Sequence, residues 1–182
     1  MKSTPLTIPD VILFEPEIYE DQRGLFFESF NQKKFEDAIG YNSVFVQDNH
    51  SSSKNNVLRG MHYQLPPKAQ GKLVRATRGE IFDVAVDIRA NSPTFGQWVG
   101  TSLSEINRLQ MWIPEGFAHA FLTISDIAEV QYKTTNEYAP ELERCIAWDD
   151  PTINIQWPLK AEAVLSPKDE MGVSLQESDT FP

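Results

Sequence analysis

The sequence lacks several features that define large classes of protein. Its single cysteine, Cys145, cannot form an internal disulfide. Every apolar run is shorter than the roughly eighteen residues that a membrane-spanning helix needs. The first residues also lack the charged start and apolar run of a signal peptide. We therefore expect no membrane association and a cytoplasmic location.

Positive charge is also scarce. The chain has 16 Lys and Arg residues against 26 Asp and Glu residues, which gives a net charge of −10 at pH 7. Binding to nucleic acid depends mainly on clustered lysine and arginine that neutralise phosphates. The composition therefore argues against a nucleic-acid partner, although it does not exclude a small anionic ligand.

Short apolar segments make up most of the chain. With 182 residues, 41% of them hydrophobic, we expect one domain over 1–182 with one substantial core. Twelve prolines and nine glycines separate segments of strand length, which predicts an all-β sandwich or barrel. One short helix is expected over 31–39, ended by Gly40, and an irregular tail from Asp169. Strands are expected at 11–19, 24–30, 44–49, 57–65, 72–76, 80–88, 97–103, 109–113, 117–124, 128–134 and 145–157.

Two histidines lie in separate strand-like segments, His62 in VLRGMHYQL and His119 in WIPEGFAHAF. Because a strand alternates its faces, His62 should share a face with Gly60 and Gln64, and Arg59 should lie on the other face. A small residue and a polar one suit a lined cavity better than a sealed core. We therefore predict that His62 points into a pocket, with a hydrogen-bonded core histidine as the alternative.

Eight blocks of sequence occur in order along nearly the whole chain. They are DQRG from Asp21 with FFE, FVQDNHSSS, VLRGMHYQ, QGKLVR, SPTFGQW, IPEGFAHAF, WDDP and LSPKD. Together they resemble the dTDP-4-dehydrorhamnose 3,5-epimerases, a family of cupin enzymes. The resemblance implies a double-stranded β-helix, or jelly roll, built as a homodimer that needs no cofactor and no metal. It also implies conversion of dTDP-4-dehydro-6-deoxy-D-glucose to dTDP-4-dehydro-L-rhamnose by inversion at C3 and C5.

The resemblance implies four catalytic residues. His62 would remove a proton beside the ketone, Asp169 would pair with its other ring nitrogen, and Tyr132 would protonate the opposite face. Such a carbon acid lies about a dozen pKa units above histidine, so the ketone oxygen also needs a cation, and Lys72 matches that position. Read alone, Tyr132 would be an ordinary strand tyrosine and Asp169 an exposed tail carboxylate.

Further residues match substrate contacts of the family. Arginine suits phosphate oxygens, and Arg23, with Phe26 and Glu28, is expected near the nucleotide in the partner subunit's site. The alternative for Arg23 and Glu28 is a solvated pair on an edge strand. Tyr138 matches the aromatic residue that packs on thymine. The other implied contacts are Gln47, Asn49, Arg59, His119, Glu143 and Lys168.

Three other functions remain open. A metal-dependent cupin would explain Pro114-x-Gly116-x-x-His119, but Gln64 stands where its first motif needs a second histidine, and His50 lies outside the expected spacing. A sugar-binding module would keep the pocket without needing the catalytic set. An epimerase acting at one carbon would share that set.

One position departs from the family pattern. Ala120 follows His119 where the family usually has glycine. The extra methyl group is expected beside the pocket, where it would shift His119 slightly.

Overall fold

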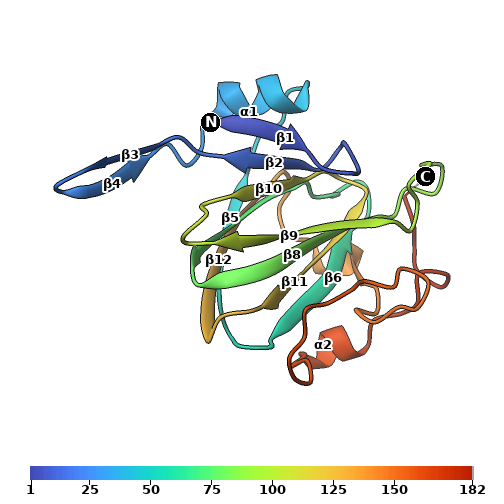
Figure 1. The fold of residues 1–182 in the computed structure, drawn as a ribbon. Coiled ribbons are helices and arrows are strands. Elements are labelled where there is room, and N and C mark those ends of the chain that lie inside the picture. The colour runs from blue at the N-terminus through green and yellow to red at the C-terminus, as the bar shows by residue number, and fades with distance from the viewer. Residues whose placement is uncertain (182) are drawn as a thin grey trace.

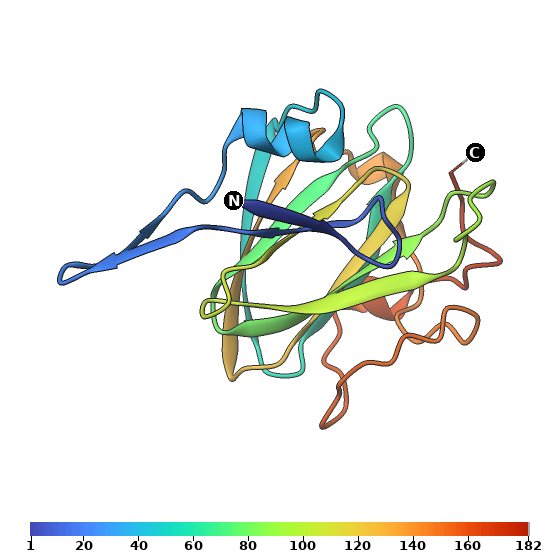
Figure 2. The same cartoon turned by 45° about the horizontal axis from the view of Figure 1, so that its top comes forward.

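Two large antiparallel sheets form the body of the protein in the computed structural model, which describes residues 1–181. The six-stranded sheet has the order β1 (Lys2–Pro5), β2 (Ile12–Glu15), β10 (Gln110–Ile113), β7 (Lys72–Arg78), β12 (Ile127–Thr134) and β5 (Gln47–Lys54). The five-stranded sheet has the order β13 (Glu143–Cys145), β6 (Leu58–Gln64), β11 (Phe117–Thr123), β8 (Glu80–Asp87) and β9 (Trp98–Ser104). Figures 1 and 2 show the two sheets facing each other. The predicted all-β cupin jelly roll is confirmed.

A two-stranded ribbon projects away from this body. It consists of β3 (Ile18–Asp21) and β4 (Gly24–Phe27), which pair only with each other in the described chain. Figure 1 shows the ribbon, which we call the arm, extending far to one side of the sheets. Most of its residues are exposed, because a single ribbon has no second layer to cover it.

Helices are short and lie outside the sheets. The predicted helix at 31–39 is confirmed as α1 (Gln32–Ile39), with the Asn31 side chain accepting from the Lys34 N–H and Gly40 closing the helix at φ 84°. The sequence prediction did not include β1, the 3₁₀ helix Pro140–Leu142 or α2 (Pro167–Glu170). None of the helices in residues 1–181 is long and apolar enough to cross a membrane.

Several predicted strand boundaries are wrong for local reasons. The segment 11–19 divides into β2 and β3 at Pro16, which has no N–H to donate to a ladder. The predicted strand 44–49 instead begins at Gln47 and continues to Lys54. Strand 145–157 does not form beyond Cys145, because the Asp150 carboxylate accepts the backbone N–H groups of Thr152 and Ile153 and holds a turn.

The core is divided into three groups of apolar side chains. The largest lies between the two sheets and includes Val74, Ile81 and Phe117. A second covers the outer face of the five-stranded sheet, where residues such as Ile146 and Ile153 pack on Val84 and Val86. The third packs α1 on the outer face of the six-stranded sheet, around Phe35 and Trp112. Polar side chains on the inner strand faces are therefore enclosed between the two sheets.

A bulge in β6 changes which side chains face the interior. His119 of β11 pairs with His62, and Phe121 pairs with Arg59. Between these two pairs β6 advances by three residues and β11 by two, so β6 has one extra residue. The extra residue reverses the alternation, and Arg59 and His62 line the same cavity. The prediction that they lie on opposite faces was wrong, because it assumed an unbroken strand.

Gly60 lies in this bulge and packs tightly against β11. A Cβ atom at Gly60 would lie 2.5 Å from both the Ala120 Cβ and the His119 carbonyl oxygen. Glycine is therefore needed for close approach, and it does not leave free room beside His62 as expected. The Ala120 methyl group belongs to the outer apolar group, on the face of β11 opposite His119, so it does not reach the pocket.

Replacing Gly60 with alanine should therefore be unusually costly. Gly60 combines a φ of +125° with no space for a methyl group, so we expect Gly60→Ala to lower the free energy of unfolding by about 2–4 kcal/mol. Gly40→Ala is the matched control, since it has φ +84° but nothing within 4 Å, and it should cost about 1 kcal/mol. Urea unfolding measures both values. Equal losses would show that crowding against β11 contributes nothing.

Candidate active site

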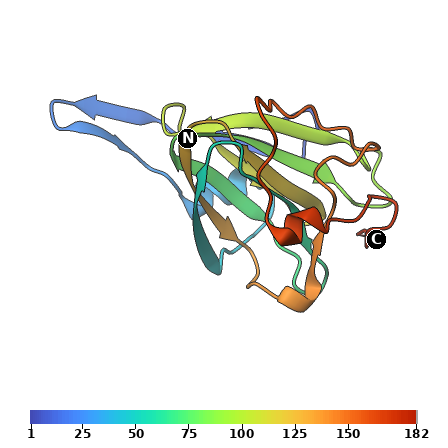
Figure 3. The same cartoon turned by 90° about the horizontal axis from the view of Figure 1, so that it is seen from below.

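A cavity of about 320 Å³ opens between the two sheets. Strands β6, β11 and β13 supply side chains from one sheet, and β5 and β12 supply them from the other. In Figure 3, which is seen from below, α2 lies in front of the sheets. Ser166, Lys168 and Asp169, at this helix, add the last side chains to the cavity. The structure brings eight of the fourteen predicted site residues into its wall: Arg59, His62, His119, Tyr132, Tyr138, Glu143, Lys168 and Asp169.

His62 and Asp169 form a close ionic contact. Nε2 of His62 lies 2.6 Å from Oδ1 of Asp169, and only 3% of the Asp169 side chain is exposed. Burial alone would raise the pKa of Asp169, but hydrogen bonding with His62 and Ser166 outweighs burial and lowers the pKa to about 2. The carboxylate is therefore charged at neutral pH.

Helix α2 determines the position of Asp169. The Ser166 hydroxyl donates to Oδ2 of Asp169 at 2.6 Å, and the Asp169 N–H donates back to Ser166 at 3.3 Å. The Gly60 N–H also donates to Oδ1 at 3.3 Å. Ser166 was not among the predicted site residues, although Ser-Pro-Lys-Asp reads as an N-cap followed by proline at the first helical position.

Lys72 is a buried cation next to the strand that carries His62. Its Nζ donates to the His62 backbone oxygen at 3.1 Å, and the residue is 7% exposed. Burial lowers the pKa of Lys72 to about 8, although the carboxylates of Glu143 and Asp83 oppose this shift. The ammonium is therefore charged at neutral pH and poorly shielded by water, which strengthens its field.

His119 has a buried carboxyl partner that the sequence prediction missed. Its Nε2 lies 2.7 Å from Oδ1 of Asp83, and neither side chain reaches solvent appreciably. Burial raises the pKa of Asp83 and lowers the pKa of His119, so each shift favours the uncharged form of its side chain. In such a pair Nδ1 carries a proton and can donate a hydrogen bond. Asp83, which has apolar residues on both sides in IFDVAV, was the available signal.

Tyr132 approaches the cavity from the other sheet. It lies on β12, and its ring centre is 6.5 Å from that of His119. Burial, followed by the nearby Glu143 carboxylate, raises the pKa of Tyr132. The phenol is therefore protonated at neutral pH. The cavity thus lies between a histidine on one sheet and a proton-bearing phenol on the other.

Polar side chains on β5 support the rim of the cavity. Gln47 donates to Asn49 at 2.9 Å and accepts from the Tyr138 N–H at 2.9 Å, although neither Gln47 nor Asn49 lines the cavity itself. Ser53 accepts from Nε of Arg59 at 3.0 Å. Ser51 lines the cavity with a buried hydroxyl that has no partner in residues 1–181. Neither serine was predicted, although both share the inward face of β5 with Gln47 and Asn49.

Glu143 connects two other wall residues. Its carboxylate accepts from the Tyr138 hydroxyl at 2.6 Å and forms an ion pair with Lys168. Burial alone would raise the pKa of Glu143, but the Lys168 and Tyr138 hydrogen bonds outweigh this effect and lower it. The carboxylate therefore holds a cation and an aromatic side chain at the cavity entrance.

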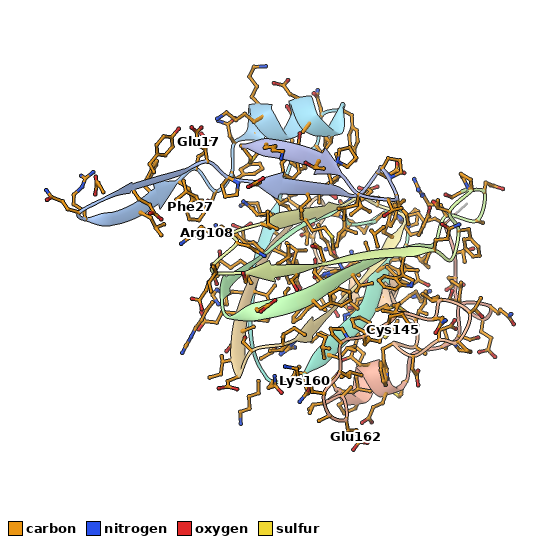
Figure 4. All side chains as sticks on the ribbon, viewed as in Figure 1. Glu17, Phe27, Arg108, Cys145, Lys160 and Glu162 are labelled. Atoms are coloured by element: carbon orange, nitrogen blue, oxygen red, sulfur yellow. The ribbon has the colours of Figure 1, made fainter. Side chains whose placement is uncertain are left out.

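Three predicted residues lie on or next to the arm and not in the cavity of their own chain. Arg23 forms an ion pair with Asp21, and Phe26 is 68% exposed. Glu28 follows β4 and pairs with Lys34 at 2.8 Å. The alternative of a pair between Arg23 and Glu28 does not form. Figure 4 labels two residues that mark the ends of the projecting ribbon. Glu17 directly precedes β3, and Phe27 is the last residue of β4.

The three histidines do not converge on one metal position. His50 is exposed on β5 and lies 3.3 Å from the Glu129 carboxylate. Its Nδ1 also contacts the Gln131 amide at 3.2 Å. His119 contacts Asp83 through Nε2. The three-histidine set considered from the sequence is therefore not assembled.

Fold and site together define an enzyme-like cupin whose cavity brings together a histidine–carboxylate pair and a protonated phenol. A family model described as dTDP-4-dehydrorhamnose 3,5-epimerase matches residues 5–177. The chain belongs to this family, as the resemblance in its sequence predicted.

Individual relatives agree with this assignment. The chain is 60% identical over 182 residues to a dTDP-4-dehydrorhamnose 3,5-epimerase of Pseudomonas aeruginosa, and the match covers all of both chains. A crystal structure of the Legionella pneumophila enzyme, in complex with dTDP-4-keto-L-rhamnose, superposes with a TM-score of 0.95 at 49% identity. That match covers 98% of this chain and 94% of the other. A 3'-monoepimerase from Streptomyces bikiniensis, in complex with dTDP-quinovose, gives a TM-score of 0.89 at 35% identity and covers 94% and 87% of the two chains.

Proposed function

We propose that this protein is a cofactor-independent dTDP-4-dehydrorhamnose 3,5-epimerase that converts dTDP-4-dehydro-6-deoxy-D-glucose to dTDP-4-dehydro-L-rhamnose in the cytoplasm. The observation that carries this proposal is the placement of His62 and Tyr132 on opposite sheets with one cavity between them. Inversion at a carbon requires removal of a proton from one face and delivery of a proton to the other. A base and an acid on facing walls meet that requirement.

The hydrogens at C3 and C5 both flank the C4 ketone, so the same chemistry applies twice. Asp169 contacts Nε2 of His62, which leaves Nδ1 to accept the proton from carbon. The electron pair of the broken C–H bond moves to the ketone oxygen and forms an enolate. Tyr132 then donates its proton to the opposite face of the carbon, and solvent exchange restores both side chains.

Stabilisation of the enolate decides whether this route is feasible. Proton transfer from such a carbon acid to histidine is uphill by about 16 kcal/mol without help. Lys72 supplies a buried positive charge, and the Asp83 partner of His119 favours an Nδ1–H donor on that ring. Donors fixed in an enclosed site act on developing charge without waiting for solvent to reorganise.

The remaining wall residues suit a nucleoside diphosphate sugar. Arg59, held through Nε by Ser53, keeps its terminal nitrogens available for phosphate oxygens. Lys168 adds a second cation at the entrance, and Tyr138 offers an exposed ring for the thymine. Gln47, Asn49 and Glu143 fix the position of Tyr138 and its surroundings.

The arm supports a homodimer with sites shared between subunits. Ile18, Tyr19, Leu25 and Phe26 expose apolar surface on a ribbon that has no second layer in its own chain. Docking on a second copy would cover that surface and carry Arg23, Phe26 and Glu28 to the partner's cavity. The nucleotide would then be bound by both chains.

Hydrogen exchange at C3 and C5 tests the chemistry. Proton NMR of the chelator-treated protein with dTDP-4-keto-6-deoxy-D-glucose in deuterated water should show deuterium and inversion at both carbons. His62→Asn should slow exchange at both by about a thousandfold, because it removes the base. Tyr132→Phe should keep exchange but impair inversion. His50→Asn and Tyr41→Phe, at exposed positions, are the controls.

The same spectra separate the alternatives. Label at one carbon alone would assign the protein to the one-centre class, whose fold it shares with the Streptomyces bikiniensis 3'-monoepimerase. Exchange that persists at both carbons in His62→Asn would reject His62 as the base. No exchange in the unaltered protein, despite tight binding of the nucleotide sugar, would overturn the enzymatic proposal in favour of a binding module.

Loss of charge on Lys72 should limit activity at high pH. In the free protein the pKa of Lys72 is about 8, so the ammonium loses its charge as pH rises through that value. The value of kcat/KM should fall over the same pH range. Lys72→Arg keeps the charge and should move the fall to higher pH, even if the maximal rate is lower. Lys68→Arg, at a partly exposed position, is the control and should leave the profile unchanged. An unchanged alkaline limb in Lys72→Arg would reject this assignment.

Mixed dimers test the sharing of the site. Arg23→Ala and His62→Asn homodimers should both be weak enzymes. A dimer of one Arg23→Ala chain and one His62→Asn chain can be purified through two different tags. If the site is shared, one of its two cavities combines the intact His62 of one chain with the intact Arg23 of the other. Activity should therefore recover at that cavity. If Arg23 acts within its own chain, each cavity keeps one defect and no recovery occurs.

A further inference from the structure

A third reactive side chain lies beside the His62–Asp169 pair. Cys145 is directly opposite His62 in the β13–β6 ladder. One donor atom each from His62, Cys145 and Asp169 lies within 4.8 Å of the other two. In the part of the chain that the structure describes, this is the one group of three such residues close enough to share a metal ion. Figure 4 shows Cys145 beside β6 and above α2.

The thiol of Cys145 has the weakest contacts in this group. It makes a weak contact with the Ile146 carbonyl at 3.7 Å. Nε2 of His62 is buried, and its polar contact within residues 1–181 is the one with Asp169 at 2.6 Å. Cys145 also shares a face of β13 with Glu143, which lines the cavity. The group therefore adjoins the wall of the cavity, which His62 and Asp169 line.

The three donor types select a class of metal. Imidazole nitrogen, thiolate sulfur and carboxylate oxygen together suit Zn²⁺, whose bonds to these ligands are about 2.0–2.3 Å long. Magnesium and calcium prefer sites made only of oxygen. Tetrahedral zinc with such bonds places its ligand atoms about 3–4 Å apart, so small side-chain rotations would close the set. The fourth position would open to the cavity.

We propose that His62, Cys145 and Asp169 form an inhibitory binding site for Zn²⁺ or another thiophilic divalent cation. The ion takes the place of the contact between His62 and Asp169. The ring proton moves from Nε2 to Nδ1 of His62 by exchange with solvent, and the thiol proton leaves to solvent, as the metal–nitrogen and metal–sulfur bonds form. The Asp169 carboxylate then balances the charge of the metal ion and no longer that of a protonated His62. Because His62 is held as a metal ligand, it cannot act as the base. The inhibition rests on the proposed function, whereas the metal site itself does not.

Cobalt absorption tests the site without any assay of activity. The chelator-treated protein, free of thiol reductants, is titrated with Co²⁺, and a thiolate-to-cobalt charge-transfer band is expected. Because Cys145 is the one cysteine of the chain, such a band must come from it. Zn²⁺ should abolish the band and Mg²⁺ should not. Cys145→Ser and Cys145→Ala should lack it, whereas His50→Ala, which alters an exposed histidine, should keep it.

Inhibition is then measured by deuterium exchange at C3 and C5. Zn²⁺ should inhibit, a chelator should reverse the effect, and Cys145→Ser should keep its basal rate while needing about tenfold or more Zn²⁺ for the same inhibition. Equal sensitivity of Cys145→Ser, or no charge-transfer band in the unaltered protein, would overturn the proposal. A band in a protein without exchange activity would support the metal site and reject the proposed epimerase function.

Discussion

The close approach of β6 to β11 at Gly60 is the constraint on which the site depends. There the backbone of one strand occupies the space that a side chain would need, against Ala120 and the His119 carbonyl. The bulge that accompanies this contact turns Arg59 and His62 to the same side. It also directs the Gly60 N–H toward the Asp169 carboxylate. One local distortion thus brings Arg59, His62 and Asp169 to the same cavity.

Enclosure between two sheets explains how the polar groups are arranged. Ionisable groups at the cavity have counterparts: His62 with Asp169, His119 with Asp83, and Lys72 near the carboxylates of Asp83 and Glu143. Burial of an unpaired charge would cost several kcal/mol, so such pairing is a condition for folding as well as for chemistry. The same enclosure raises the pKa of Tyr132 and lowers that of Lys72, in both cases through desolvation.

The fold class could be predicted from local patterns, whereas the site residues were expected from the resemblance of eight sequence blocks to a known family. Strand-length apolar segments indicated an all-β fold, and Asn31 and Gly40 marked the one longer helix. The orientation of Arg59 could not be read from alternation, because the bulge arises from contact with a strand about sixty residues away in sequence. Asp83 was missed because a carboxylate between apolar strand residues does not show which residue pairs with it. Ser166 was missed although its capping pattern was visible.

Helix α2 has a consequence for the order in which the protein becomes functional. Gly60 and Asp169 are separated by 109 positions, yet one hydrogen bond joins them, and the contact between His62 and Asp169 spans nearly the same distance along the chain. All thirteen strands of residues 1–181 precede α2 in sequence. A chain emerging from the ribosome therefore presents every one of these strands before the carboxylate partner of its histidine. The contact between His62 and Asp169 can form only after the last of them has been synthesised.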